Sequence, residues 1–528
     1  MNNTIKLSKN SNQVKDLIEY SAKFMRLGKP SHEVLERTKL FHTDSVLCGV
    51  SALALRTNAP SILKDEAMTF EKKTAVASKR MPFYARCFGS PTLVPIEKAV
   101  SANCSAVREW DSNGTVFGYR EGHPNHQAGE FGHNDFYSVV VGAATHNGNI
   151  DGKTALKAMV LQDEIRGRLA ESFSLKTYKI DHVVHGAIAS AIVYGQLIGA
   201  KPEQIESAVG MFLAHYIPFR AIRAGHQLSD SKGASAAIST EAAILSVKRS
   251  MMGFQGPQDI FRNPEAIFRL MTQTQEEEVP FELLLGYKGD DFSIMGQHFK
   301  LGLYEHQSGG AIQGLLNLLF NDRNLALNTP ENIENINIVA YDHCYRIIGG
   351  EEKWRPTTRQ SADHSMVYIL STLLRKAMEL REGLYAGVQS TDDLWKKLML
   401  EPEDYSPRAI NNDVTRRLMS KMTVEYGGEE YDKEYPKGIP TSLEIKYGDK
   451  MLNSGMILYP AGHARNTDAD LYDILNYKFN LLGRLALNEE EMDYFINQLQ
   501  NIENLSNKEI RSLYNCNIKY ASKSIDSL

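Results

Sequence analysis

Residues 107–144 read VREWDSNGTVFGYREGHPNHQAGEFGHNDFYSVVVGAA, and the rest of the chain is organised around this stretch. Between Asp111 and Asp135 it contains five glycines, one proline and three histidines. Glycine lets the backbone take unusual conformations and approach a ligand closely, and long connections of this kind are often functional. The stretch therefore predicts a ligand-binding loop. A solvated loop whose polar residues only form turns is an equally good interpretation of the same residues.

The end of the loop predicts the start of a helix. The apolar run Phe136 to Ala144 follows Asn134 and Asp135, which are good N-cap residues. His133 would then stand just before a helix. Together with Asp111 and Thr115, it could converge on a small polar substrate.

A second candidate segment begins at residue 180. Asp181 precedes a run rich in Gly, Ala and Ser, which indicates a central, closely packed helix. His182 would lie in its first turn, where the positive end of the helix dipole favours anions and keeps an imidazole neutral. The alternative interpretation is a buried histidine bonded to a neighbouring carbonyl.

Three cations follow in the next connections. Arg220 and Arg223 are three residues apart after Pro218, and arginine suits two-pronged recognition of carboxylates, although each could equally form an ordinary surface ion pair. Lys232 opens a predicted helix from Gly233 to Val247, so its charge and the helix N-terminus could bind one anion. The alternative for Lys232 is a solvated first turn.

Composition limits the classes of protein. The chain has 528 residues, 42% of them hydrophobic and 23% charged, which is globular and long enough for two or more domains. A net charge of −5 gives no general affinity for nucleic acid. The five cysteines form no Cys-x-x-Cys pair, which argues against zinc-ribbon, thioredoxin and clustered iron–sulfur motifs and favours reduced thiols.

The termini and the apolar runs predict where the protein resides. The first residues resemble neither a secretory signal nor a transit peptide, and the most apolar run, Val183 to Ala200, is interrupted by polar residues and glycines. We expect a cytoplasmic protein without a membrane partner. The mitochondrial matrix is the alternative if the source is eukaryotic.

The periodicity of the chain predicts a mainly α fold with two domains. Residues 1–283 and 467–528 are expected to form a large helical domain, and residues 284–466 a smaller α+β lid. Within the lid, Asp291 to Tyr304 predicts a strand and Ala362 to Leu380 one long helix. In the helical domain, Glu164, Arg166 and Arg168 are expected on a solvated face.

Several motifs resemble the MmgE/PrpD family in the family's order. They are Arg-Glu-Trp-Asp111-x-x-x-Thr115, Gly132-His133, Asp181-His182, Asp230-Ser-Lys232-Gly-Ala-Ser, Phe299-Lys300 and Ala362-Asp-His364-Ser. Together they cover most of the chain, and the segments from Asp163 to Arg166 and from Pro218 to Arg223 are most similar to the eukaryotic-type branch. The resemblance implies a two-domain fold and a homodimer formed through the helical domain.

The resemblance also implies an activity. It implies a lyase that eliminates water from 2-methylcitrate to give 2-methyl-cis-aconitate in propionate catabolism, without a cofactor or metal. Such a reaction needs one base, one acid and several cations for the carboxylates of the substrate. The implied catalytic residues are Asp111, His133, His182 and Lys232, and the implied substrate-binding residues are Thr115, Arg220, Arg223 and Lys300.

Other interpretations remain open at the level of sequence. Decarboxylation of cis-aconitate is the alternative activity within the same family, and a helical binding protein is the alternative outside it. Which histidine would be acid and which base is open, and His364 is expected to hold the lid helix rather than react. His123, His126, Glu130 and His133 are residue types that bind zinc, but their spacing fits no standard metal motif.

Overall fold

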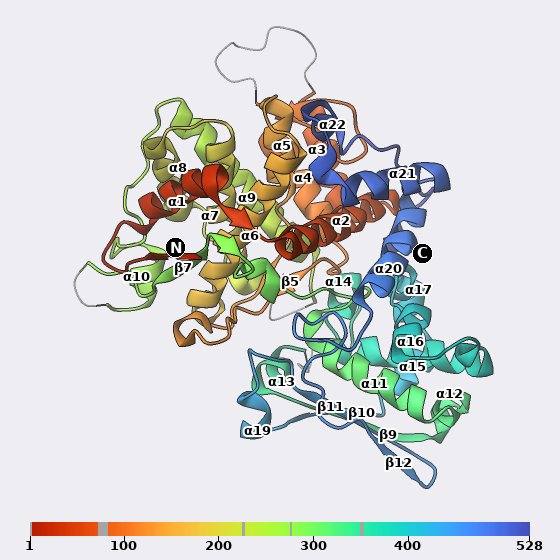
Figure 1. The fold of residues 1–528 in the computed structure, drawn as a ribbon. Coiled ribbons are helices and arrows are strands. Elements are labelled where there is room, and N and C mark those ends of the chain that lie inside the picture. The colour runs from red at the N-terminus through yellow and green to blue at the C-terminus, as the bar shows by residue number, and fades with distance from the viewer. Residues whose placement is uncertain (1–2, 72–82, 224–226, 275–276, 349–352, 528) are drawn as a thin grey trace.

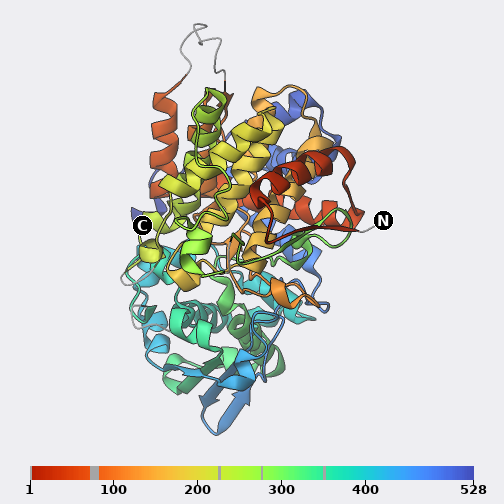
Figure 2. The same cartoon turned by 90° about the vertical axis from the view of Figure 1, so that its left-hand side faces the viewer.

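The computed structural model describes residues 3–71, 83–223, 227–274, 277–348 and 353–527. Two parts lie one above the other in Figure 1, and the view turned by 90° shows the same arrangement (Figure 2). The upper part is helical. Its main helices are α1 (Gln13–Leu27), α2 (His32–Ala54), α3 (Asn58–Thr69), α4 (Ile96–Arg108), α5 (Ser138–His146), α6 (Gly152–Ser172), α7 (Val183–Leu197), α8 (Pro202–His215) and α9 (Asp230–Met251).

Helix α7 is the centre of the helical part, as its small residues predict. It is packed against α6, α8 and α9, and nearly all of its side chains are buried. At Gly186 a Cβ atom would overlap the ring of Phe136, so only glycine allows this approach between α7 and the segment that leads into α5.

Helix α6 corrects one expectation. Glu164, Arg166 and Arg168 are buried instead of solvated. Arg168 forms ion pairs with Glu164 and Glu171, at 2.8 and 2.9 Å, and Arg166 lies 2.5 Å from Asp163. Charged side chains can be buried at this density because each has a partner of opposite charge.

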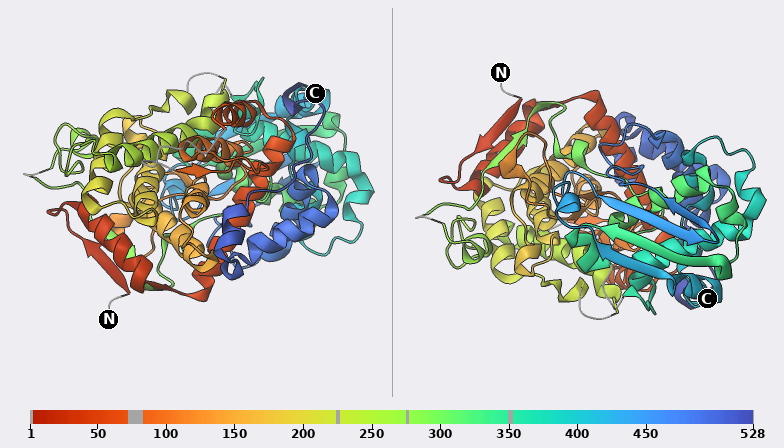
Figure 3. Two further views of the ribbon diagram at one scale, coloured as in Figure 1. Left: turned by 90° about the horizontal axis from the view of Figure 1, so that it is seen from above. Right: turned by 90° about the horizontal axis from the view of Figure 1, so that it is seen from below.

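The lower part contains a four-stranded sheet in the order β10-β9-β11-β12. Strand β9 (Ile333–Ala340) pairs in parallel with β10 (Met422–Tyr426) and antiparallel with β11 (Thr441–Tyr447), and β11 forms a hairpin with β12 (Lys450–Asn453). Helices α11 (Gly309–Asn321), α15 (Met366–Leu380) and α16 (Thr391–Leu398) lie on the side toward the helical part, and the strands are uncovered when seen from below (Figure 3).

The remaining elements are short or complete the helical part. Helices α20 (Leu471–Ala486), α21 (Glu489–Gln500) and α22 (Asn507–Ser512) return to it, with α20 against α2. The short helices are α10 (Ile267–Met271), α12 (Asn324–Leu327), α13 (Asp342–Ile348), α14 (Arg359–Ala362), α17 (Pro407–Ile410), α18 (Asp413–Met419) and α19 (Glu429–Asp432). The two-stranded pairs are β1 (Thr4–Leu7) with β7 (Leu283–Gly286), β2 (Lys29–Pro30) with β8 (Lys288–Gly289), β3 (Tyr84–Ala85) with β4 (Val94–Pro95), and β5 (Thr115–Val116) with β6 (Gly132–His133).

The predicted fold class, mainly α with a smaller part that contains a sheet, is confirmed. The expected domain boundary at residue 284 falls inside β7, which still pairs with the N-terminal strand β1. Among the described residues, no single helix is long and apolar enough to cross a membrane. Only α2 and α3 pass the length and composition test, as a pair bent by 86°.

Two predicted elements of the lower part are wrong. The expected strand from Asp291 to Tyr304 is a 3-10 turn (Ser293–Gly296) followed by an extended segment, which makes only a single bridge, between Thr115 and His298. The expected long helix from Ala362 is broken: α14 ends at Ala362 and α15 begins at Met366, with Ser365 as its N-cap. The break exposes Asp363 and His364 as a corner between two helices.

Candidate functional site

A cavity of about 540 Å³, including its open mouth, lies where the two parts meet. The helical part contributes residues from the ends of α4 and α7 and from the β5–β6 hairpin, and the lower part contributes the segments before α11 and α15. The lining residues are Arg108, Asp111, Thr115, Phe117, Phe131, His133, His182, Arg220, Arg223, Glu305, Gln307, Ile347, Lys353 and His364.

The glycine-rich stretch forms one wall of this cavity. Thr115 in β5 and His133 in β6 are direct partners across the two-stranded pair, and the Thr115 hydroxyl donates to the Gly132 carbonyl at 2.9 Å. Arg108 Nη2 lies 3.0 Å from His133 Nε2. Arginine has no acceptor, so Nε2 must accept this hydrogen bond and Nδ1 carries the proton.

Asp111 is the most constrained residue of the site. It follows α4 with a φ of 51°, in the left-handed region that aspartate tolerates better than most residues. Lys300 Nζ contacts both its carbonyl, at 2.6 Å, and its carboxylate, at 2.9 Å, and Arg108 forms an ion pair with the same carboxylate. These two buried cations stabilise the charged form of the Asp111 side chain.

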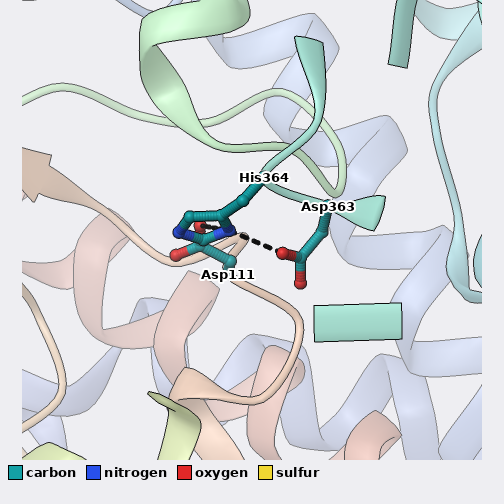
Figure 4. Close-up of side chains that lie close together, drawn as sticks. All are labelled: Asp111, Asp363 and His364. Carbon is teal, nitrogen blue, oxygen red and sulfur yellow. Dashed lines mark hydrogen bonds and ion pairs between the residues drawn. The ribbon is translucent and has the colours of Figure 1, made fainter. Parts of the chain in front are cut away.

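Asp363 and His364 occupy the break between α14 and α15 (Figure 4). Lys232 Nζ contacts both carboxylate oxygens of Asp363, at 2.7 and 2.8 Å, and His364 Nδ1 lies 2.6 Å from Asp363 Oδ1. The same nitrogen is 3.4 Å from Asp111 Oδ2. A carboxylate can only accept, so Nδ1 of His364 donates and Nε2 keeps its lone pair.

The start of α7 carries the other carboxylate pair of the site. His182 is its N-cap, and Asp181 is buried beside it. Arg223 Nε lies 2.5 Å from Asp181 Oδ2. Burial opposes ionisation of Asp181, but Arg223 and His182 outweigh it, so the pKa of this carboxyl is lowered. Arg220 is half-buried nearby, and one of its guanidinium nitrogens, Nη1, is buried without a partner among the described residues.

The environment keeps the imidazoles of the cavity neutral. Burial, followed by the charge of Arg108, lowers the pKa of His133 well below 6.5. Burial also lowers the pKa of His182, against the opposing effect of Asp181, and burial and Lys232 lower that of His364. At neutral pH these side chains can therefore accept a proton or a hydrogen bond, but they carry no imidazolium proton.

Six of the eight residues predicted from the sequence line the cavity: Asp111, Thr115, His133, His182, Arg220 and Arg223. Lys232 and Lys300 do not line it, and both are buried behind the wall against Asp363 and Asp111. Burial lowers the pKa of Lys232 to about 7, although Asp363 raises it. The two lysines reach the cavity through their carboxylate partners.

Five lining residues with polar or charged side chains were not among the predicted site residues: Arg108, Glu305, Gln307, Lys353 and His364. Arg108 is the second residue of the quoted stretch, and its burial at the end of α4 has no local sequence signal. His364 had such a signal, because Ser365 is a typical N-cap residue and marks a helix start after it.

The cavity offers one group of potential metal ligands in the described part of the chain. A carboxylate oxygen from Asp111, another from Asp363 and a ring nitrogen of His364 lie within 4.8 Å of one another. Arg108, Lys300 and Lys232 already contact these carboxylates, so a divalent cation would meet three positive charges. The donor set therefore fits a hydrogen-bond network better than a metal. Of the residue types that suggested zinc, His126 contacts Glu171, whereas Glu130 accepts from the backbone of Phe131 and Lys176.

Comparison with known proteins agrees with these positions. The curated relatives include 2-methylcitrate dehydratase of Escherichia coli K12, 21% identical over 76% of this chain and 78% of its own length. They also include alkylcitrate dehydratase phiI of a fungal species, at 27% over 78% and 81%, and the probable 2-methylcitrate dehydratase of Saccharomyces cerevisiae, at 23% over 81% and 78%. The family model described as the MmgE/PrpD N-terminal domain matches residues 16–280, which carry every predicted site residue except Lys300. The chain belongs to the MmgE/PrpD family.

Proposed function

We propose that this protein is a hydro-lyase that removes water from 2-methylcitrate, or a closely related 2-alkylcitrate, to give the unsaturated tricarboxylate. The observation that carries the proposal is the composition of the cavity wall. Three arginines, Arg108, Arg220 and Arg223, line one small cavity together with neutral imidazoles. A substrate with several carboxylates and a weakly acidic C–H bond needs this combination.

The arginines supply the carboxylate grip. Their guanidinium groups present paired donors that match the two oxygens of a carboxylate. Arg220 Nη1 and both ring nitrogens of His182 are buried without hydrogen-bond partners among the described residues. Buried polar atoms without partners are rare in folded proteins, so their concentration at one cavity supports a polar ligand that completes them.

The apolar part of the wall favours a substituted citrate. Phe117, Phe131 and Ile347 line the same cavity as the arginines. An alkyl substituent placed against them would be removed from water, which contributes about 0.8 kcal/mol per CH₂ group. The names of the relatives, 2-methylcitrate and alkylcitrate dehydratase, agree with a substrate that has both charged and apolar parts.

His364 is the base that the geometry favours. Its Nδ1 donates to Asp363, which leaves the Nε2 lone pair available, whereas His133 Nε2 already accepts from Arg108. A carboxylate behind an imidazole fixes the tautomer and stabilises the imidazolium that forms when the base takes a proton. In this proposal Lys232 and Asp363 position His364, and Asp111 closes the network from the other side.

The test is a product analysis with purified protein. 2-Methylcitrate, citrate and cis-aconitate are offered separately, and the products are followed by proton NMR and by release of carbon dioxide. We expect the unsaturated acid from 2-methylcitrate, more slowly from citrate, and no carbon dioxide. Carbon dioxide from cis-aconitate without dehydration of 2-methylcitrate would replace the proposal by a decarboxylase. Folded protein inactive on all three acids would refute both.

A further inference from the structure

Elimination of water needs an acid as well as a base, because hydroxide is a poor leaving group. The three cavity histidines are neutral at neutral pH, since burial lowers the pKa of each. Asp111 is held between Arg108 and Lys300 as a carboxylate. None of these four groups is therefore a ready source of the proton that the hydroxyl must receive.

Glu305 is placed to supply that proton. It lines the cavity in the segment between Lys300 and α11, beside Gln307. Its backbone N–H donates to the Asp363 carbonyl at 2.9 Å, which fixes it next to the Asp363–His364 corner. Oε2 accepts from the Gln307 N–H at 2.8 Å, and Oε1 has no hydrogen bond to the described residues. One oxygen thus anchors the carboxyl group while the other remains available.

Burial controls the protonation of this carboxyl group. It raises the pKa of Glu305 to about 7, although Lys300 and the Gln307 N–H act in the opposite direction. A glutamic acid with such a pKa carries its proton in a large fraction of molecules at neutral pH, and an acid is most effective when its pKa is near the working pH. The opposite shifts at Glu305 and His364 separate an acid from a base in one cavity.

Resting on the dehydratase function proposed above, we propose that Glu305 is the general acid that protonates the leaving hydroxyl. His364 Nε2 takes the proton from the carbon next to a carboxylate, and the electron pair of that C–H bond forms the C=C bond. The C–O bond breaks as the carboxyl proton of Glu305 passes to the hydroxyl oxygen, which leaves as water. Glu305 ends as a carboxylate and His364 as an imidazolium, and exchange with solvent restores both.

The decisive experiment varies the leaving group in the variant Glu305→Gln, which keeps the size of the side chain and removes its acidic proton. For 2-methylcitrate we expect kcat to fall by about 10²-fold or more. In an analogue whose hydroxyl is replaced by chloride, the leaving group needs no proton, so elimination should proceed close to the wild-type rate. The alkaline limb of the wild-type pH profile, which follows deprotonation of Glu305 around pH 7, should disappear in the variant.

The outcomes separate this inference from the proposed function. Wild-type protein that does not dehydrate 2-methylcitrate removes the proposed function itself. If the wild type is active, equal losses on the hydroxyl and chloro substrates would give Glu305 a structural role and overturn the inference, as would unchanged activity on both. Gln307→Met is the matched control, since it lies on the same wall and should change both rates by one factor. Thermal melting and binding of a saturated tricarboxylate verify that each variant is folded.

Discussion

Asp363→Asn is the perturbation that tests the network behind His364 most sharply. Asp363 is 2% exposed and Lys232 1%, and the two form a buried ion pair with both carboxylate oxygens. An asparagine keeps the shape and can still accept from Lys232, but it removes the compensating charge. Leaving one buried charge without its partner costs about 3–5 kcal/mol of stability.

The same change reverses the hydrogen bond to His364. The asparagine amide would donate to Nδ1, so the proton of the imidazole would move to Nε2, the nitrogen that must act as base. Tautomer reversal of this kind in catalytic triads costs several orders of magnitude, and we expect kcat to fall by about 10²-fold or more, with KM little changed. Initial rates over a range of 2-methylcitrate concentrations separate the two constants.

A double variant distinguishes stability from catalysis. Lys232→Met combined with Asp363→Asn removes both charges, and replacing a buried pair by neutral groups is often tolerated. Its melting temperature should recover toward that of the wild type, whereas kcat should remain low because the tautomer is still reversed. If activity returns together with stability, or if Asp363→Asn alone retains wild-type kcat, the reasoning on His364 is refuted.

Three further predictions follow from other parts of the site. Arg220→Met should raise KM by about 10- to 100-fold, since a hydrogen bond to a charged group contributes about 1.5–3 kcal/mol, and an unchanged KM would remove Arg220 from the carboxylate grip. Gly118→Ala should destabilise the β5–β6 hairpin more than Gly122→Ala: both glycines have positive φ, but only at Gly118 would a Cβ atom overlap a backbone carbonyl, and melting temperatures compare the two. Removal of divalent cations with EDTA should leave kcat unchanged, because Lys232, Lys300 and Arg108 already compensate the candidate metal ligands, and loss of activity restored by one metal would contradict this.

The local patterns predicted much of the helical part and several site residues. The small residues of α7 indicated a central helix, and the glycine-rich loop indicated convergence of Thr115 and His133, which are direct partners across β5 and β6. These predictions succeeded because the determining residues are neighbours in sequence, where spacing alone fixes which side chains share a face or a turn.

The missed features depend on contacts between segments far apart in the chain. Arg168 looks like a solvated position of an amphipathic helix until Glu164, Glu171 and Asp291 surround it. Lys232 looked like a substrate clamp, and only the fold brings Asp363, 131 residues away, against its amine. The apolar periodicity from Ala362 concealed the helix break that places His364 in the cavity, and Glu305 gains its raised pKa from burial that no local pattern encodes.

The central claim is that the cavity between the two parts binds a tricarboxylate for elimination. A crystal structure with a saturated tricarboxylate that lacks the hydroxyl, and so cannot react, tests it most directly. The account predicts ligand carboxylates against Arg108, Arg220 and Arg223, with the carbon that would lose its proton facing His364 and the carbon that would carry the hydroxyl facing Glu305. A ligand bound elsewhere, or bound here without contact to the arginines, would contradict it.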